Sequence, residues 1–503
     1  MKEEDIKIEL TKLIVIKKSI VLTSIVIIIA SCSILKVSKQ ANLSSDLSIA
    51  KQYSKYINKN DLKSNLTVLA SDDFEGRETT KKGQKKAAEF IKEFFVNNNV
   101  QPPKQNQYFQ NFSVNVTDYK RINIVVNNEE LKIIDHFYCI GSTNDTSINN
   151  KQIVDVKYGI STSEYDNYKG LDVKGKIVLI NEDIPAEIDP SNKWTSWRKK
   201  VLIAKEKGAS AVICIKKDYE KALEVIKPYL LYPEMKMHYD VRLKSNLIPY
   251  ICISKETHQL YFKNKDILVD IEIDITYDAS AENVMGFVKG ETDEIIVISA
   301  HYDHLGFDNG EICNGADDDG SGTVCLMSIA KAFQKAKNDG HTSKRSILFL
   351  AVSGEEKGLF GSKYYTDNPL FPLENTVADL NIDMVGRVDT IHNHSNYIYL
   401  IGSDRISKDL HEISEKVNKD YIGFELDYTY NDENDPNHFY YRSDHYNFAK
   451  NGVPVIFYFS GLHEDYHKPT DDVEKINFDK LEKTAHYVFL TAWELANREK
   501  RIR

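Results

Sequence analysis

The sequence predicts an α/β protein with a mixed, largely parallel central sheet covered by helices on both faces, and a small β-rich inserted domain. From Asn283 onward, near-continuous apolar segments alternate with helical patterns, which is typical of strands buried on both faces. Residues 133–274 instead hold short β-type runs. With 503 residues the chain also exceeds the length at which one hydrophobic core usually stops growing, which favours two domains.

The composition is that of an ordinary globular protein, with 42% hydrophobic and 28% charged residues. The formal net charge is −10, and no basic stripe interrupts the acidic balance. Proteins that bind nucleic acid present basic surfaces to the phosphates, so we expect no nucleic-acid partner.

The first residues resemble an export signal. Lys17 and Lys18 precede an apolar stretch, residues 20–30, that is short for a spanning helix. The stretch ends in the run IASC at Cys32, which resembles the lipobox of bacterial lipoproteins. That resemblance implies lipidation of Cys32 and attachment of the protein to a membrane of the cell envelope, outside the cytoplasm.

Residues 1–32 are therefore interpreted as a lipoprotein-type signal segment and residues 33–60 as a polar tether. An uncleaved anchor helix with an incidental cysteine is the alternative. Both interpretations place the protein at a membrane surface outside the cytoplasm.

Residues 61–132 are assigned to the front part of the main domain. They carry helical patterns interrupted near residues 71–77, and the second pattern, over residues 82–97, has an apolar side and a lysine-rich side. Two short β-type segments follow, at residues 109–116 and 121–126.

Residues 133–274 are predicted to form the inserted domain. The segments at residues 173–179 and 204–209 resemble the protease-associated domain, a β-rich insert found in several peptidase families. No catalytic residue types cluster here, so a lid or substrate-guiding role is the most that this segment supports. Cys214 and Cys252 lie in apolar runs and are interpreted as buried thiols.

Residues 275–503 complete the main domain, and ligand-type side chains follow each of its predicted strands. The strands are expected at Ile295–Ser299, Ile347–Val352, Val377–Ile382 and Val453–Phe459, and helices at Gly322–Lys337 and Lys408–Asn418. In open α/β sheets, ligands bind beyond the carboxyl ends of the strands. The residues that follow these four strands are His301 and Asp303, then Glu355 and Glu356, then Asp383, and finally His463 and His467. We therefore expect these side chains to converge.

Three successive carboxylates, Asp317 to Asp319, add to this set. They repel one another unless a cation lies among them, although a solvated acidic turn that caps the next helix is an alternative. Histidine and carboxylate ligands without thiolate favour zinc over manganese or cobalt. Two such pairs with one shared carboxylate form a site for two metal ions, which can activate a bridging water.

The motifs HYDHLG, NGADDDGSG, SGEEKGLFGS, NIDMVG and YHKPTDD occur in this order. Together they resemble the two-zinc exopeptidase family, which includes bacterial leucyl aminopeptidases and, with altered function, glutamate carboxypeptidase and the transferrin receptor. The resemblance covers residues 61–503, interrupted by the insert, and implies two zinc ions. It assigns one zinc to His301 and Asp383, the other to Glu356 and His467, and the bridging position to Asp318.

The same resemblance implies roles for other residues. Glu355 would be the general base, Asp303 would orient the ligand His301, and Tyr466 would stabilise the oxyanion. Arg442 would shape the substrate end of the pocket.

These roles imply a zinc exopeptidase acting on peptides, most simply an aminopeptidase. The alternatives are a carboxypeptidase or dipeptidase of the same family, or a catalytically silent surface binding protein. A literal His-Glu-x-x-His match at residues 463–467 is set aside, because a following Pro469 leaves no room for the helix that a single-zinc protease needs. His463 is then near the site or merely exposed, and His304 is given no ligand role.

Overall fold

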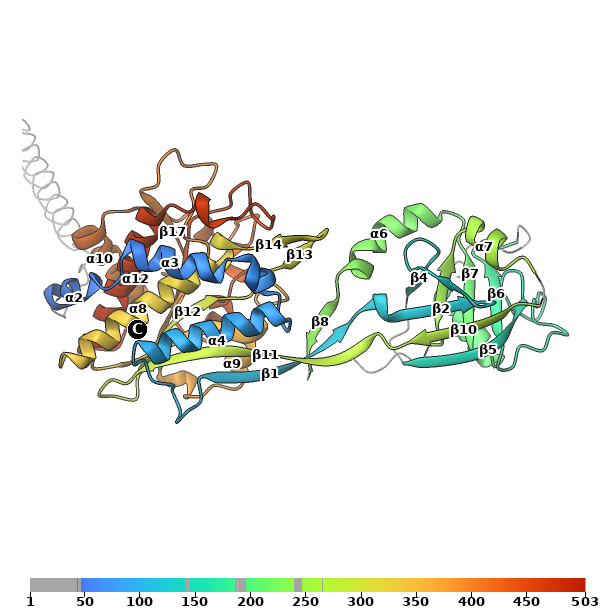
Figure 1. Ribbon diagram of the computed structural model, residues 1–503, viewed down its shortest axis with the longest axis horizontal. Coiled ribbons are helices and arrows are strands. Elements are labelled where there is room, and N and C mark those ends of the chain that lie inside the picture. Colours follow the sequence, from blue (N-terminus) through green and yellow to red (C-terminus); the bar gives the residue numbers. More distant parts are fainter. Residues whose placement is uncertain are drawn as a thin grey trace, which may run out of the picture.

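The computed structural model describes residues 43, 47–140, 145–185, 188, 196–238, 247–264 and 266–502. Cys32 and the expected signal segment lie outside these residues. Two sheet-based domains lie end to end (Figure 1). None of the described helices is long and apolar enough to cross a membrane.

The first domain is built on a nine-stranded sheet with the order β18-β17-β19-β16-β12-β15-β11-β1-β8. Its four central strands, β19, β16, β12 and β15, are parallel, and antiparallel pairs flank them. The bounds are β1 Phe109–Thr117, β8 Glu234–Met237, β11 Thr276–Val288, β12 Ile295–His301, β15 Ser346–Val352, β16 Thr376–Ile382, β17 Tyr397–Ile401, β18 Glu425–Asp427 and β19 Val455–Phe459. The prediction of a mixed α/β sheet is confirmed.

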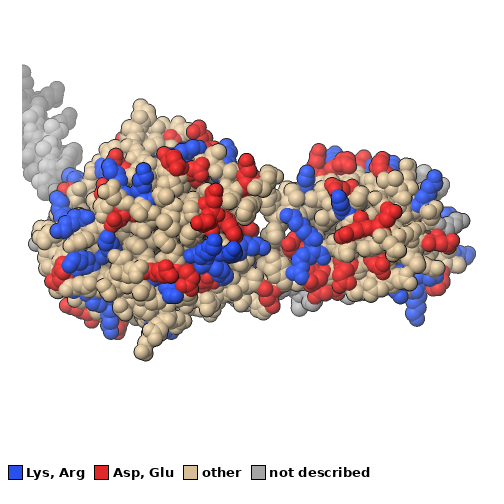
Figure 2. Space-filling model, viewed as in Figure 1, with Lys and Arg blue, Asp and Glu red and all other residues tan. Residues whose placement is uncertain are grey.

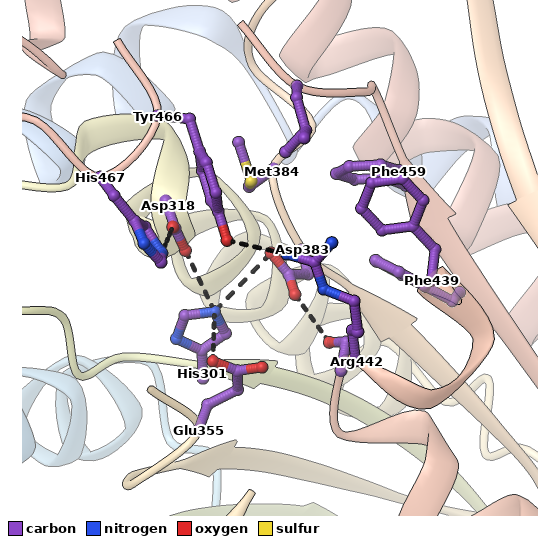
Figure 3. Close-up of a pocket in the computed structure, with 13 residues that line it drawn as sticks. His301, Asp318, Glu355, Asp383, Met384, Phe439, Arg442, Phe459, Tyr466 and His467 are labelled. Carbon is purple, nitrogen blue, oxygen red and sulfur yellow. Dashed lines mark hydrogen bonds and ion pairs between the residues drawn. The ribbon is translucent and has the colours of Figure 1, made fainter. Parts of the chain in front are cut away.

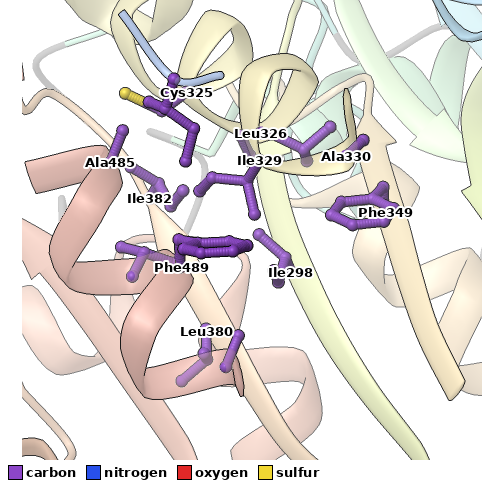
Figure 4. Close-up of a cluster of buried hydrophobic side chains, with 14 of the residues drawn as sticks. Ile298, Cys325, Leu326, Ile329, Ala330, Phe349, Leu380, Ile382, Ala485 and Phe489 are labelled. Atoms are coloured by element: carbon purple, nitrogen blue, oxygen red, sulfur yellow. The ribbon is translucent and has the colours of Figure 1, made fainter. Parts of the chain in front are cut away.

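Helices cover both faces of this sheet. On one face lie α2 (Leu47–Ser54), α3 (Lys59–Leu69), α4 (Lys82–Asn97), α8 (Gly322–Asn338), α10 (Lys408–Val417) and α12 (Phe478–Asn497). On the other lie α9 (Phe360–Asp367) and α11 (His445–Ala449). The central core forms where α8 and α12 pack on β12, β15 and β16, around Ile298, Ile329 and Phe489 (Figure 4).

The expected tether is wrong in its second half. Residues 47–54 form α2, and Leu47, Ala50 and Tyr53 are buried in the main core. Three apolar side chains at helical spacing are the reason, since they form a stripe that packs against α12 and α8.

The second domain is an eight-stranded sheet with the order β3-β2-β10-β5-β6-β7-β9-β4. Its strands are β2 Ile122–Val126, β3 Glu129–Leu131, β4 Phe137–Ile140, β5 Thr146–Asp155, β6 Ile177–Asn181, β7 Ala211–Ile215, β9 Tyr250–Ile253 and β10 Leu268–Ile273, with helices α5 Trp197–Glu206, α6 Tyr219–Leu231 and α7 Lys255–Tyr261. The predicted boundary at residue 133 is wrong, because β2 pairs with β10 and so places the insert's first strand at Ile122.

The insert joins the first domain at one particular edge of its sheet. Strand β11 is antiparallel to β15, so it enters the sheet where β15 ends. Strand β1 is antiparallel to β11 and therefore leaves the sheet at that same edge. The insert thus extends from the edge at which the central parallel strands have their carboxyl ends (Figure 1).

A small hairpin projects from this edge. It consists of β13 (Gly306–Asp308) and β14 (Glu311–Cys313), which follow β12 in the chain. The hairpin points towards the insert, beside the end of α6 and β8 (Figure 1).

Candidate metal centre

The side chains that follow the central strands meet in one pocket at the carboxyl edge. His301 ends β12, Glu355 follows β15, Asp383 follows β16, and His467 lies in the loop after β19. They surround the same hollow (Figure 3). The pocket is open to solvent on one side and is lined by His301, Asp318, Glu355, Asp383, Met384, Phe439, Arg442, Ser443, Phe457, Phe459, Leu462, Tyr466 and His467.

Asp318 lies between two histidines. Its Oδ1 is 3.3 Å from His301 Nε2, and its Oδ2 is 3.2 Å from His467 Nε2. Each histidine also faces a second carboxylate: His301 Nε2 is 3.6 Å from Asp383 Oδ1, and His467 Nε2 is 3.3 Å from Glu356 Oε2. The arrangement is two His–carboxylate pairs that share one aspartate.

The carboxylates of Asp317 and Asp319, the neighbours of Asp318, instead accept hydrogen bonds from backbone N–H groups. Asp317 Oδ1 accepts a hydrogen bond from Gly386 N at 2.6 Å. Asp319 accepts from the backbone N–H groups of His301, Gly322 and Met384. Although an Asp319 oxygen lies within 4.8 Å of ligand atoms of His301 and Asp383, these three donors already occupy its carboxylate. Asp318 is therefore the member of the triplet whose two oxygens both face imidazole.

His304 belongs to the cluster, which the sequence analysis missed. It is fully buried, and its Nδ1 lies 2.8 Å from Glu356 Oε1. Ligand atoms of His304, Asp318 and Glu356 lie within 4.8 Å of one another. Glu356 thus presents one oxygen to His304 and the other to His467. The spacing His-x-x-His after a strand was the only signal in the sequence that could have indicated this position.

Glu355 faces the first half of the cluster. Its Oε2 lies 3.9 Å from His301 Nε2, and its backbone N–H donates to Asp303 Oδ1 at 3.3 Å. Burial raises the pKa of the Glu355 carboxyl well above its usual value. A carboxylate with a raised proton affinity, one side chain away from the ligand atoms, can accept a proton from water held there.

Asp303 positions its surroundings mainly through its backbone. Its carbonyl oxygen is 3.1 Å from His301 Nδ1, whereas its Oδ1 is 3.9 Å away. The carboxylate accepts a hydrogen bond from Thr79 Oγ1 at 2.7 Å. The partner that orients the imidazole of His301 is thus the carbonyl of the residue whose carboxylate was expected to do so.

Tyr466 and Arg442 both line the pocket and contact each other. The Arg442 guanidinium lies 3.4 Å from the Tyr466 hydroxyl and stacks over the ring of Phe439. The ring of Tyr466 stacks on His467 with centroids 3.8 Å apart. His463 lies deeper, with its Nε2 3.3 Å from Asp317 Oδ2, so it contacts the carboxylate triplet without entering the pocket.

Arg77 forms hydrogen bonds with two of the loops that carry the candidate ligands. Its side chain is fully buried and donates to the carbonyl oxygens of Leu69, Tyr302, Asn314 and Gly315, at 2.6 to 3.0 Å. Tyr302 lies between His301 and Asp303, and Gly315 precedes the aspartate triplet. One guanidinium therefore fixes both loops, and burial lowers its pKa to about 10.

Among the described residues, imidazoles are the ion-pair partners of the carboxylates in this cluster. In the part of the chain that the structure describes, no lysine or arginine forms an ion pair with Asp318, Glu356 or Asp383. Buried carboxylates are paired or bind metal. The donor set of imidazole and carboxylate oxygens fits zinc, and the shared position of Asp318 fits two ions.

Two parts of the chain match known protein families. Residues 283–492 match Peptidase family M28, and residues 140–260 match the PA domain. The chain is 25% identical over 350 residues to Aminopeptidase YwaD of Bacillus subtilis (strain 168), which covers 66% of this chain and 64% of that protein. It is 27% identical over 229 residues to a probable leucine aminopeptidase of Arthroderma benhamiae, covering 44% and 60%.

Both alignments span a little less than two thirds of the relatives' own lengths. Among solved structures, the aminopeptidase from Aneurinibacillus sp. strain AM-1 has a TM-score of 0.49 at 20% identity, covering 90% of this chain and 97% of that one. BSAP, a zinc aminopeptidase from Bacillus subtilis, also has a TM-score of 0.49 at 20% identity, covering 88% and 96%.

The PA match lies inside the eight-stranded domain, and the M28 match contains every residue of the cluster around Asp318. The part of the chain that builds the metal centre is therefore similar to peptidase family M28, and the insert is similar to the PA domain.

Proposed function

We propose that this protein is a zinc-dependent aminopeptidase that removes N-terminal residues from peptides. The observation that supports this most directly is the position of Asp318 between two separate His–carboxylate pairs. His301 and Asp383 would hold one zinc ion, His467 and Glu356 the other, with Asp318 shared. His304, beside the second oxygen of Glu356, would orient that ligand.

Two zinc ions bound here would polarise the peptide carbonyl and lower the pKa of a water between them to about 7. Glu355 would take the proton from that water and pass it to the leaving amine, as a general base that then acts as an acid. The Tyr466 hydroxyl, with Arg442 3.4 Å behind it, would donate a hydrogen bond to the developing oxyanion. Asp303 would keep the imidazole of His301 in place.

The apolar part of the pocket supports a preference for apolar N-terminal residues. Its walls include Met384, Phe439, Phe457, Phe459 and Leu462. Pockets of this kind bind apolar side chains by removing them from water.

Purified protein should contain about two zinc ions per chain and should hydrolyse leucine nitroanilide and unblocked peptides. N-acetylated peptides should resist it if the free amine is recognised. Release of residues from the carboxyl end would instead favour a carboxypeptidase, and cleavage of dipeptides alone would favour a dipeptidase. Zinc binding without hydrolysis of any of these would favour a silent binding protein, and retention of activity by His301→Ala would exclude this site.

We also propose that the protein is anchored to a membrane of the cell envelope through a lipid on Cys32. The IASC run after an apolar stretch supports this. Cys32→Ser should lose acyl label and move from the membrane to the soluble fraction. A variant that stays in the membrane with an intact N-terminus would favour the uncleaved anchor helix.

A further inference from the structure

A second cavity lies between the two domains. It is open to solvent and is lined by Glu78, Lys81, Asp118, Lys120, Leu231, Tyr232, Pro233, Leu305, Phe307, Asn309 and Gly310. One wall is the hairpin that follows β12, and the opposite wall is the end of α6 in the insert. The Tyr232 hydroxyl donates to Asp308 Oδ1 at 2.8 Å, so a hydrogen bond joins the two walls.

This cavity lies close to the metal centre. Leu305 is four residues beyond His301, so the two Cα atoms are at most about 14 Å apart. Glu78, on the cavity wall, pairs with His304 in a β-bridge, and its Oε1 is 3.2 Å from Nζ of Lys357. Lys357 follows Glu356 directly. The cavity and the metal centre therefore share the loops after β12 and β15.

The charges in the cavity favour an anion. Within the described residues, the ammonium groups of Lys81 and Lys120 have no hydrogen bond or ion pair. Of the two carboxylates, Glu78 is balanced by Lys357, whereas Asp118 keeps its charge and accepts a hydrogen bond from Lys120 N at 3.0 Å. The two lysines of the cavity therefore outnumber its one unbalanced carboxylate. Lysine and arginine side chains gather on both sides of the junction between the domains (Figure 2).

Two aromatic side chains in the cavity are exposed. The side chain of Phe307 is 51% exposed and that of Tyr232 is also 51% exposed. Exposed aromatic rings in a cavity that also holds two lysines suit a flexible chain that has apolar side chains and a terminal carboxylate.

We propose that this cavity binds the carboxyl-terminal part of a peptide substrate, with the free carboxylate held by Lys81 and Lys120. An extended peptide advances about 3.3 to 3.6 Å per residue, so three or four residues beyond the scissile bond span the distance from the metal centre. The inference rests on the proposed function, and it identifies the substrate class as short peptides of about four to five residues.

The test uses the full chain with zinc and the double variant Lys81→Ala/Lys120→Ala. Its matched control is Lys63→Ala/Lys151→Ala, which also removes one exposed lysine from each domain, away from the cavity. The substrates are leucine nitroanilide and one pentapeptide in two forms, with a free carboxylate and with a carboxyl-terminal amide.

We expect kcat/KM for the free-carboxylate pentapeptide to fall roughly 3- to 10-fold in the cavity variant, through a higher KM. The amidated pentapeptide should change less, and leucine nitroanilide, which does not reach the cavity, should not change. The control variant should match the wild type. Equal kinetics of wild type and cavity variant on the free-carboxylate peptide would overturn the proposal.

A binding measurement separates this proposal from the proposed function. Calorimetry with a pentapeptide whose first peptide bond is reduced to an amine needs no turnover. If the wild type cleaved nothing but the cavity variant bound this peptide more weakly, the aminopeptidase assignment would fail while the cavity assignment held. If both proteins bound it equally, the cavity assignment would fail.

Discussion

In both domains, parallel strands of the central sheet end beside acidic residues. The two domains differ in which side chains balance the negative charge at that edge. In the insert, Glu182 follows β6 and forms an ion pair with Lys216, which follows β7. Lys200 Nζ donates to the carbonyls of Asn181, Glu182 and Asp183, at 2.8 to 3.1 Å. The insert therefore supplies its own cations.

In the nine-stranded domain, the described residues that form ion pairs with Asp318, Glu356 and Asp383 are all histidines. The pKa values of the acids reflect this difference. Burial raises the pKa of Glu355. At Glu182 burial also acts to raise the pKa, but the hydrogen bonds from Lys216 and the Lys217 backbone, together with the charges of Lys216 and Lys200, outweigh it and lower the pKa. An acidic strand end is thus structural where the chain carries its own counter-charge, and it is a candidate site where the charge remains uncompensated.

Substitution of Glu355 tests this distinction with the largest expected effect. Glu355→Gln keeps the size and polarity of the side chain but cannot take a proton. We expect turnover of leucine nitroanilide to fall roughly 10²- to 10⁴-fold, with both zinc ions retained. Steady-state kinetics and metal analysis of the same preparation check this. Loss of zinc by this variant would mean that Glu355 is a ligand.

Glu356→Gln is the matched control, because it makes the same change one residue away. Glu356 lies 3.3 Å from His467 Nε2, so its loss should weaken one zinc site, and excess zinc should partly restore activity. Retention of both ions at low free zinc would reverse the two assignments.

The second prediction concerns Arg77, whose guanidinium donates hydrogen bonds to carbonyl groups of the loops around the metal centre. Arg77→Lys removes the planar fork that fixes both ligand loops, and zinc affinity should fall roughly 10- to 100-fold. Competition with a chromogenic chelator measures this. Arg345→Lys is the control: Arg345 is also buried and holds the carbonyls of Leu495 and Arg498, but at the amino end of β15. Equal zinc affinities in the two variants would show that Arg77 only stabilises the fold.

Much of this edge could be predicted from the sequence. Strand ends are local features, and apolar runs such as Ile295–Ser299 locate them, so the convergence of His301, Glu355, Asp383 and His467 follows from the rule for open sheets. Asp318 could be distinguished within its triplet only through a family resemblance, because its neighbours differ from it in their backbone partners, which depend on distant segments such as Met384.

The features that the sequence analysis missed also depend on contacts between segments that are distant in the sequence. His304 looked unremarkable because its contact with Glu356 joins two strands. The tether was extended too far because three apolar residues in Leu47–Ser54 form a weak signal until α12 is there to cover them. The insert began earlier than predicted because β2 is recognised by its pairing with β10 and not by composition.

The third prediction concerns Lys480, a buried lysine of α12 in the nine-stranded domain. Lys480 is 3% exposed, makes no hydrogen bond with the described residues through Nζ, and lies over the ring of Tyr397. Burial lowers its pKa to about 7, although Asp317 and Asp389 face it and oppose the shift. Between pH 7 and about 10.5 the unfolded chain binds one more proton than the folded protein, so this group makes stability rise with pH.

Lys480→Met should remove this contribution. The free energy of unfolding of the variant should exceed that of the wild type at pH 7, on the order of 1 to 3 kcal/mol, and the difference should shrink towards pH 9.5. Denaturant titrations of both proteins at the two pH values measure the difference, in which all other titrating groups cancel. A difference independent of pH would show that Lys480 keeps its proton in the fold.

The smallest effect is expected in the insert, where we predict a small loss of stability and no loss of zinc or turnover. Glu182 is 36% exposed and Lys216 is 16% exposed, so solvent screens their ion pair in part. Glu182→Gln should lower the free energy of unfolding of the insert by less than about 1 kcal/mol. Because the folded pKa of Glu182 is depressed, this contribution is present above about pH 4.3 and is lost as the pH falls further. Hydrogen exchange of β6 and β7 at pH 7 can resolve this change in stability.

Zinc content and turnover of leucine nitroanilide should stay at the wild-type level in Glu182→Gln, since this carboxylate already has its cation. A loss of zinc or of nitroanilide turnover in Glu182→Gln would contradict the view that an acidic strand end with its own lysine has only a structural role.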